Sequence, residues 1–171
     1  QAKGEITNPR ENILVFFGVG EDVLHFNSTR VIKLDPTNPF DVSKAEVIAR
    51  KQIHELMTFL KENSNAFHES ALISVAIDIG IRESRKLKGV HILTGDEIIS
   101  CTRFSDSIAL GNYDIDIHNP SGTGTSHRFF GDGEFYTIPY SSLLPKEFDN
   151  LLVAGRCLSA THEAQASVRI M

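Results

Sequence analysis

Cysteines are few in this 171-residue sequence, and long apolar runs are absent. Cys101 and Cys157 lie far apart and form no CxxC pair, so they build neither a disulfide framework nor a four-thiolate metal or iron–sulfur site. No run approaches the roughly 18 consecutive apolar residues that a membrane-spanning helix requires. The first residues contain no apolar signal core, so we expect no targeting segment, and the sequence leaves the compartment open.

A surplus of positive charge is also lacking. The sequence has 17 basic and 22 acidic residues, which gives a formal net charge of −5. An acidic chain without a basic stripe is not expected to bind nucleic acid or an anionic membrane. Apolar residues make up 41% of the chain, which is enough for a packed core and too much for a disordered chain.

No segment makes a convincing phosphate-binding loop. Residues 13–23, ILVFFGVGEDV, approach the GxGxxG fingerprint, but Val23 stands where the third glycine belongs and a strand is expected to follow it. We therefore predict a hairpin with strands over 13–17 and 23–32 and a turn at 18–20.

The remaining pattern predicts one long helix among many strands. Two capping boxes, Ser43 to Glu46 and Thr94 to Glu97, open a helix over about 43–62 and a short helix that ends near Cys101. The long helix has one apolar stripe, formed by Ala45, Ala49, Ile53, Leu56 and Leu60. Further strands are expected at 71–80, 90–93, 113–118, 135–138 and 151–154, with a glycine-rich loop at 119–133 and a helix from about His162. The fold class is α+β: mostly antiparallel sheet with one long helix, followed by a C-terminal strand–turn–helix.

Two segments have the residue types of a ligand site. Residues 80–86, GIRESRK, run from a β-branched strand into a basic turn, and a guanidinium fork suits carboxylate or phosphate. Residues 150–164, NLLVAGRCLSATHEA, end a strand at Gly155, where backbone can approach a ligand closely, and then open a helix. The alternatives are a solvated turn in which Glu83 pairs locally, and an ordinary connection between a strand and a helix.

Two other classes of function stay open on the residues alone. Aromatic side chains beside the glycine-rich loop could serve a carbohydrate-active lyase or a carbohydrate-binding module, although such residues more often belong to a core. They are Phe129, Phe130, Phe135 and Tyr136. A metal hydrolase would need His118, His127 and a carboxylate, but neither HxH nor HExxH spacing occurs, so we expect no metal.

Several segments, in this order and at this rough spacing, resemble a bacterial family of FAD-dependent oxidoreductases. The similarity covers essentially the whole chain, and its longest and most specific part is the segment that ends in SATHEA. The segments are HFNSTR at 25–30, GIRESR at 80–85, DIH at 116–118, IPY at 138–140, NLLVAGRC at 150–157 and SATHEA at 159–164.

The resemblance implies a domain organisation. Full-length members begin with a dinucleotide fold whose GxGxxG holds the FAD pyrophosphate, and a substrate-binding region is inserted into that fold. Residues 1–148 would then be the substrate-binding region, and residues 149–171 the C-terminal segment of an incomplete α/β FAD-binding domain. The expected partner is the missing N-terminal FAD-binding part of the same chain, without which this piece would bind FAD weakly or not at all and would be inactive.

The resemblance also implies roles for single residues. A hydride would pass between FAD and an unknown small-molecule or sugar-like substrate, and His162 would transfer the proton because imidazole titrates near neutrality. Arg82 and Arg85 would anchor an anionic substrate or the flavin. The expected cofactor contacts are Gly155, Arg156, Ser159, Thr161 and Glu163, and the expected substrate contacts are His118, His127 and Arg128.

Overall fold

The computed structural model describes residues 6–10, 12–118 and 125–169. They divide into two compact units, which we call the N-terminal unit (residues up to 80) and the C-terminal unit (residues 81–118 and 125–169). Each unit is described by itself below. None of the helices in the described ranges has the length and apolar character needed to cross a membrane.

The N-terminal unit begins with the predicted hairpin. Strand β1 (Val15–Gly20) pairs with β2 (Val23–Phe26) in an antiparallel register that sets Gly20 opposite Val23. The turn lies at Glu21 and Asp22, not at 18–20 as predicted, and Asp22 takes the positive φ of 57° that this tight reversal requires. The hairpin occupies the segment that most resembles GxGxxG, so no phosphate-binding turn forms there.

The long helix α1 (Pro39–Asn63) is confirmed, but it begins four residues before the predicted start. Asn38 caps it, because its side chain accepts a hydrogen bond from the Phe40 N–H, and Pro39 takes the first helical position. Ser43, the predicted cap, lies inside the helix and donates its hydroxyl to the Pro39 carbonyl.

The buried face of α1 contains residues of the predicted stripe. Ala45, Ala49 and Leu56 are buried on it. Gln52 is buried between them and exchanges two hydrogen bonds with the Arg30 backbone, at 2.8 and 2.9 Å. A short 3₁₀ turn, η1 (Asn65–Phe67), follows the helix.

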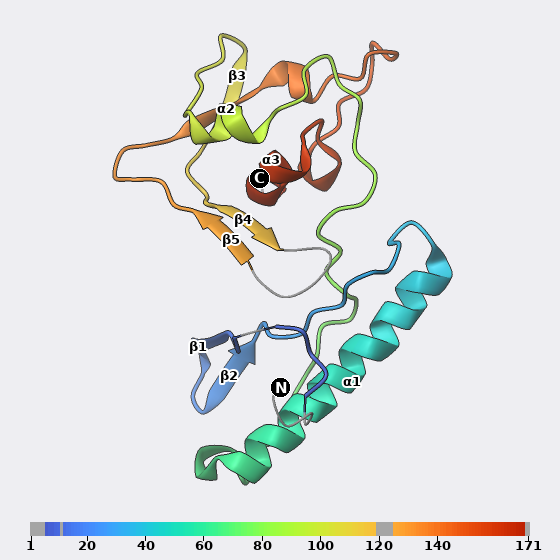
Figure 1. Ribbon diagram of the computed structural model, residues 1–171, viewed down its shortest axis with the longest axis vertical. Coiled ribbons are helices and arrows are strands. Elements are labelled where there is room, and N and C mark those ends of the chain that lie inside the picture. The colour runs from blue at the N-terminus through green and yellow to red at the C-terminus, as the bar shows by residue number, and fades with distance from the viewer. Residues whose placement is uncertain (1–5, 11, 119–124, 170–171) are drawn as a thin grey trace. The chain divides into compact units, whose positions relative to one another are not determined.

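The predicted strand at 71–80 is wrong. The segment runs along α1, where Glu46 accepts a hydrogen bond from the Ile79 N–H at 2.6 Å and Arg50 donates one to the Ile77 carbonyl at 3.3 Å (Figure 1). It joins no sheet of the described residues, and Ile73 and Ile77 are 77% and 87% exposed. A strand needs a neighbouring strand, and this apolar pattern has none in the described ranges.

The C-terminal unit contains two small antiparallel sheets. Strand β3 (Ser107–Gly111) pairs with β6 (Tyr136–Pro139), and β4 (Ile115–His118) pairs with β5 (Thr125–Arg128) (Figure 1). Strands β4 and β6 match predicted strands, whereas β3 and β5 were not predicted, and β5 falls in the expected glycine-rich loop. The expected strand at 90–93 is reduced to one isolated bridge, Leu93 with Ala160, and a second bridge, Gly89 with Pro145, lies just before it.

Two helices complete this unit. Helix α2 (Gly95–Ile99) has both arms of the predicted Thr94–Glu97 capping box. Helix α3 (His162–Val168) begins where the sequence predicts, and Thr161 caps it. Short 3₁₀ turns lie at η2 (Tyr140–Ser142) and η3 (Gly155–Cys157).

The core of the C-terminal unit lies between α2, α3 and the two sheets. Tyr136 is fully buried in it, and the Ser167 hydroxyl of α3 donates to the Asp114 carbonyl beside β4. The buried apolar members are Leu93, Ile98, Ile115, Tyr136, Ile138, Leu158, Ala160, Ala164, Ala166 and Val168. Small residues on α3 let the helix lie close to its neighbours.

The predicted buried strand at 151–154 is wrong as well. Leu151 and Leu152 are about half exposed, and the Val153 N–H donates to the Leu143 carbonyl without forming a ladder. The predicted fold class is nevertheless confirmed, because helices and small antiparallel sheets make up the described residues. The domain boundary between residues 148 and 149 stays a prediction.

Candidate functional site

The structure brings together the two segments that the sequence singled out. We call residues 81–89 and 155–163 the paired segments. The Leu87 N–H donates to the Cys157 carbonyl at 2.9 Å, and the Arg156 guanidinium donates to the Ile81 carbonyl at 2.5 Å. These bonds join positions about 70 residues apart, so the two segments lie side by side within the C-terminal unit.

A third bond between the paired segments is buried. Ser159 has no exposed surface, and its hydroxyl accepts the Gly89 N–H at 3.0 Å. A Cβ on Gly89 would lie 2.8 Å from the Ser159 Cβ, so only glycine allows this approach. Ser159 was predicted as a cofactor contact, and the hydroxyl is used here to hold the two segments together.

Glu83 connects the segments through its side chain. One carboxylate oxygen lies 2.5 Å from the His162 Nδ1, and the other lies 2.6 Å from the Lys86 ammonium. The alternative reading of the basic turn, a local Glu83 pair, is therefore realised with Lys86, and the contact with His162 is additional. Sequence reasoning missed Glu83 as a site residue, although a carboxylate among the basic residues of this turn was the available signal.

The turn at Gly155 is open to an incoming group. Gly155 has φ +66°, and a Cβ placed on it would meet no heavy atom within 4 Å. The next carbonyl, that of Arg156, accepts a hydrogen bond from Gln165 at 2.8 Å, which fixes the turn against α3. The backbone at Gly155 is open within the described residues, and its expected contact with a cofactor stays a prediction.

Thr161 and Glu163 belong to the start of α3. The Thr161 hydroxyl accepts the Ala164 N–H at 3.4 Å, and the Thr161 N–H donates to the Leu93 carbonyl at 2.8 Å. The backbone N–H of Glu163, the Thr161 hydroxyl and the charges of His162 and Lys86 hold the pKa of Glu163 below its ordinary value. Glu163 therefore adds a negative charge beside the exposed imidazole of His162.

For the other predicted site residues the structure gives fewer contacts. Arg82 and Arg85 are exposed on the basic turn of the paired segments. His118 ends β4, and His127 and Arg128 end β5. The side chains of these three substrate-side candidates lie outside the described part of the structure, so their roles stay predictions.

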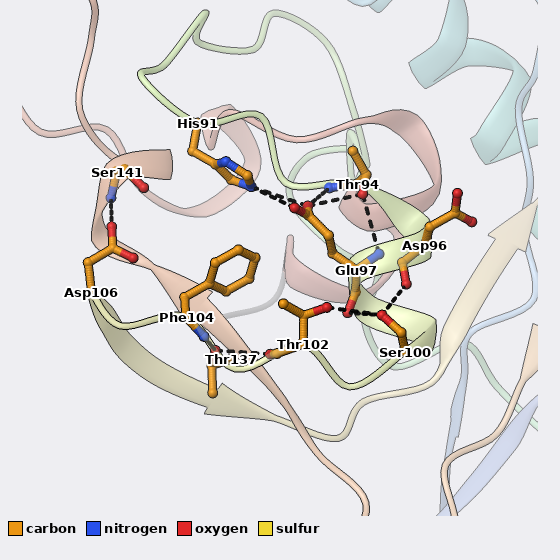
Figure 2. Close-up of polar contacts among 10 residues, drawn as sticks. All are labelled: His91, Thr94, Asp96, Glu97, Ser100, Thr102, Phe104, Asp106, Thr137 and Ser141. Atoms are coloured by element: carbon orange, nitrogen blue, oxygen red, sulfur yellow. Dashed lines mark hydrogen bonds and ion pairs between the residues drawn. The ribbon is translucent and has the colours of Figure 1, made fainter.

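A second histidine–carboxylate pair lies in the same unit and stabilises α2. The His91 Nε2 lies 3.1 and 3.2 Å from the two Glu97 carboxylate oxygens, and the Phe104 ring meets the imidazole edge-on (Figure 2). Burial raises the pKa of Glu97, but hydrogen bonds from Thr94 and His91 outweigh it and lower the pKa. The cluster fixes the capping box, which gives it a structural role.

Asp106, directly before β3, connects that strand to η2 through Ser141. Its carboxylate accepts the Ser141 N–H at 3.0 Å, and hydrogen bonds from the Ser141 side chain and backbone lower the pKa of Asp106 (Figure 2). The Ser141 carbonyl in turn accepts the His91 N–H at 3.1 Å. These contacts fix the chain just after residues 81–89, the first of the paired segments.

Three of the four aromatic residues that suggested a carbohydrate site are engaged in contacts with other side chains. Phe130 lies 5.4 Å from the Tyr136 ring in the core, and the Arg103 guanidinium lies 3.1 Å above the Phe135 ring. Phe129 is exposed. Among the described residues, no group of three histidine, cysteine or acidic side chains is placed to hold a metal ion. The suggested site at His118 and His127 depends on side chains outside that part.

The paired segments suit one end of a flavin. Their exposed cations, Arg82, Arg85 and Arg156, and the open backbone at Gly155 match the negative charge that a reduced flavin ring carries. The described residues offer no comparable match for the pyrophosphate, since the hairpin at 15–26 uses the nearest glycine motif. The exposed guanidinium groups are thus chemically compatible with a flavin ring.

A family model described as "FAD dependent oxidoreductase" matches residues 1–171. The match spans both units and every predicted site residue. No curated protein and no solved structure matches the chain.

Proposed function

The chain belongs to the family of FAD-dependent oxidoreductases, and we propose that it binds the substrate of such an enzyme and covers the flavin ring. The flavin supplies the redox chemistry by exchanging a hydride with a substrate carbon. This chain positions the substrate and the flavin ring, and it exchanges the proton. The observation that supports the proposal is the contact between the paired segments, which brings the segment that contains Arg82 and Arg85 against the segment that leads to His162.

The residues of this surface divide into two groups by chemistry. Arg82 and Arg85 bind an anionic group of the substrate, because a guanidinium offers several donors in a fixed plane. Gly155 and Arg156 would contact the flavin, where open backbone and a positive charge would favour the reduced ring. Thr161 and Glu163 flank His162, the first residue of α3, and orient the start of that helix.

His162 exchanges the proton that accompanies hydride transfer. Its side chain is 45% exposed, so a substrate hydroxyl or carbonyl can reach it. Imidazole changes its charge near neutral pH, which suits it to take a proton in one direction and return it in the other. The substrate is a small molecule or sugar-like compound with an anionic group, and His118, His127 and Arg128 are further candidates for binding it.

The proposal includes a division of labour within a longer polypeptide. The pyrophosphate end of FAD is held by an N-terminal FAD-binding part, so this chain alone binds FAD weakly or not at all. FAD titrated into the isolated chain is expected to keep its fluorescence. The longer polypeptide is expected to purify with a flavin absorbance spectrum. A longer polypeptide that purifies colourless, and stays colourless after FAD is added, would overturn the proposal.

The role of His162 is tested in that longer polypeptide by anaerobic reduction of the flavin. His162→Gln is expected to slow reduction by at least about a hundredfold, the lower range of general acid–base catalysis. His68→Gln, which changes an exposed histidine of the N-terminal unit, is the control and should reduce the flavin at the parent rate.

A further inference from the structure

A carboxylate and an imidazole from opposite members of the paired segments form a close pair. The Glu83 Oε2 lies 2.5 Å from the His162 Nδ1, across 79 positions of sequence. Their side chains are 27% and 45% exposed, so the contact lies at the surface but is partly screened from water. The two groups are therefore within hydrogen-bond distance, and a hydrogen bond to an ionised carboxylate is stronger than one between neutral groups.

Neighbouring groups hold both Glu83 and His162 in place. The second Glu83 oxygen lies 2.6 Å from the Lys86 ammonium, which leaves Oε2 to His162. His162 is the first residue of α3, directly after its cap. The backbone bond from Leu87 to Cys157 and the buried bond from Gly89 to Ser159 fix the distance between the two segments. The pair is therefore set by the fold and not by two flexible side chains alone.

We propose that Glu83 is a positioning residue, which fixes His162 as the Nδ1–H tautomer and leaves Nε2 as the nitrogen that exchanges the substrate proton. An ionised carboxylate has only acceptor oxygens, so the nitrogen that faces it must carry hydrogen. In the neutral imidazole the lone pair then lies on Nε2. The inference rests on the proposed role of His162, but the tautomer is a property of the chain without flavin.

Two other histidine–carboxylate pairs of the chain allow the tautomer of His162 to be compared. His91 faces its carboxylate, Glu97, through Nε2, so it should show the opposite tautomer. His68 faces Glu69 through Nδ1 at 2.8 Å, but the side chains of this neighbouring pair are 72% and 93% exposed. Water competes fully for the His68 pair and only partly for the His162 pair, so the tautomer of His68 should be less biased.

The test is a long-range proton–nitrogen correlation spectrum of the whole chain with nitrogen-15 histidine, at a pH where the rings are neutral. Signals of His162 are assigned from their loss in His162→Gln. We expect Nδ1 to have the shift of a protonated nitrogen and Nε2 that of an unprotonated one. A hydrogen bond to a charged group is enough for a preference of about tenfold or more over the other tautomer.

Three variants separate positioning from general damage. Glu83→Ala should bring the two His162 tautomers to comparable populations. Glu83→Gln should lower the share of the Nδ1–H form, because its single amide oxygen is also the acceptor for Lys86 and its amide nitrogen can only donate. Glu69→Ala is the matched control and should change the signals of His68 only. An amide spectrum that is unchanged outside the paired segments confirms that each variant is folded.

Two outcomes overturn the inference: a predominant Nε2–H tautomer of His162 in the parent chain, or a tautomer ratio that Glu83→Ala leaves unchanged. In the flavin-loaded longer polypeptide, Glu83→Ala should slow flavin reduction by tenfold or more and Glu83→Gln by less, with KM affected little. If the tautomer responds as expected but His162→Gln reduces flavin at the parent rate, the proposed proton transfer fails while the positioning stands.

Discussion

Replacing Ser159 by alanine removes the acceptor of a buried backbone donor. The Gly89 N–H, which now bonds the Ser159 hydroxyl at 3.0 Å, would be left without a partner inside the C-terminal unit. Leaving a buried donor unsatisfied costs about 1–3 kcal/mol. With a urea dependence of about 2 kcal/mol per M, a loss of about 2 kcal/mol lowers the unfolding midpoint by about 1 M.

Tyrosine fluorescence makes the measurement specific for one unit. The sequence has no tryptophan and three tyrosines, and Tyr113, Tyr136 and Tyr140 all belong to the C-terminal unit. Ser84→Ala is the matched control, because Ser84 is exposed on the other paired segment and its loss should change stability by less than about 0.5 kcal/mol.

The result that would refute the reasoning is a Ser159→Ala midpoint equal to that of Ser84→Ala. It would mean that the Ser159 hydroxyl does not satisfy the Gly89 N–H. A changed slope of the transition would instead indicate an altered unfolded state, so the comparison requires equal slopes.

Two further changes test the backbone and the core of the same unit. Gly155→Ala should lower the free energy of unfolding by about 1–2 kcal/mol because φ is +66°, without a clash, since the space around its Cβ is open; an unchanged urea midpoint would contradict this. Burial and the charge of Asp114 raise the pKa of Tyr136, so the folded unit keeps this phenol protonated. Its stability should fall as pH rises above about 10, the pKa of an unfolded tyrosine, and Tyr136→Phe should weaken that fall in circular-dichroism unfolding between pH 9 and 11.

Local signals in the sequence predicted local structure well. The Thr94–Glu97 capping box and the Thr161 cap depend on residues within one helical turn, and both occur as predicted. The start of α1 was wrong because two local signals compete. Asn38 followed by a proline at the first helical position outweighs the box at Ser43, since proline fits the first turn without losing a hydrogen bond.

The paired segments show what a sequence pattern omits. Each segment was identified from its own residues, yet the bond between Glu83 and His162 depends on chain folding over 79 positions. No local rule places a carboxylate at one imidazole nitrogen, so Glu83 was treated as a local partner of the basic turn. The site residues were thus chosen from chemistry, and their arrangement comes from the buried contacts behind them.

The two failed strand predictions have one physical cause. Residues 71–80 and 151–154 have the β-branched or apolar composition of strands, but β propensity measures how well side chains fit a half-buried, pleated surface. That surface consists of neighbouring strands, and within the described ranges neither segment has one; Ile77 is 87% exposed and Leu152 53%. Strand β5 is the converse case, since a glycine-flanked segment with weak propensity pairs with β4 because a neighbour is present. A strand forms only when a second segment pairs with it. The residues of one segment do not encode that second segment, so they alone cannot predict the strand.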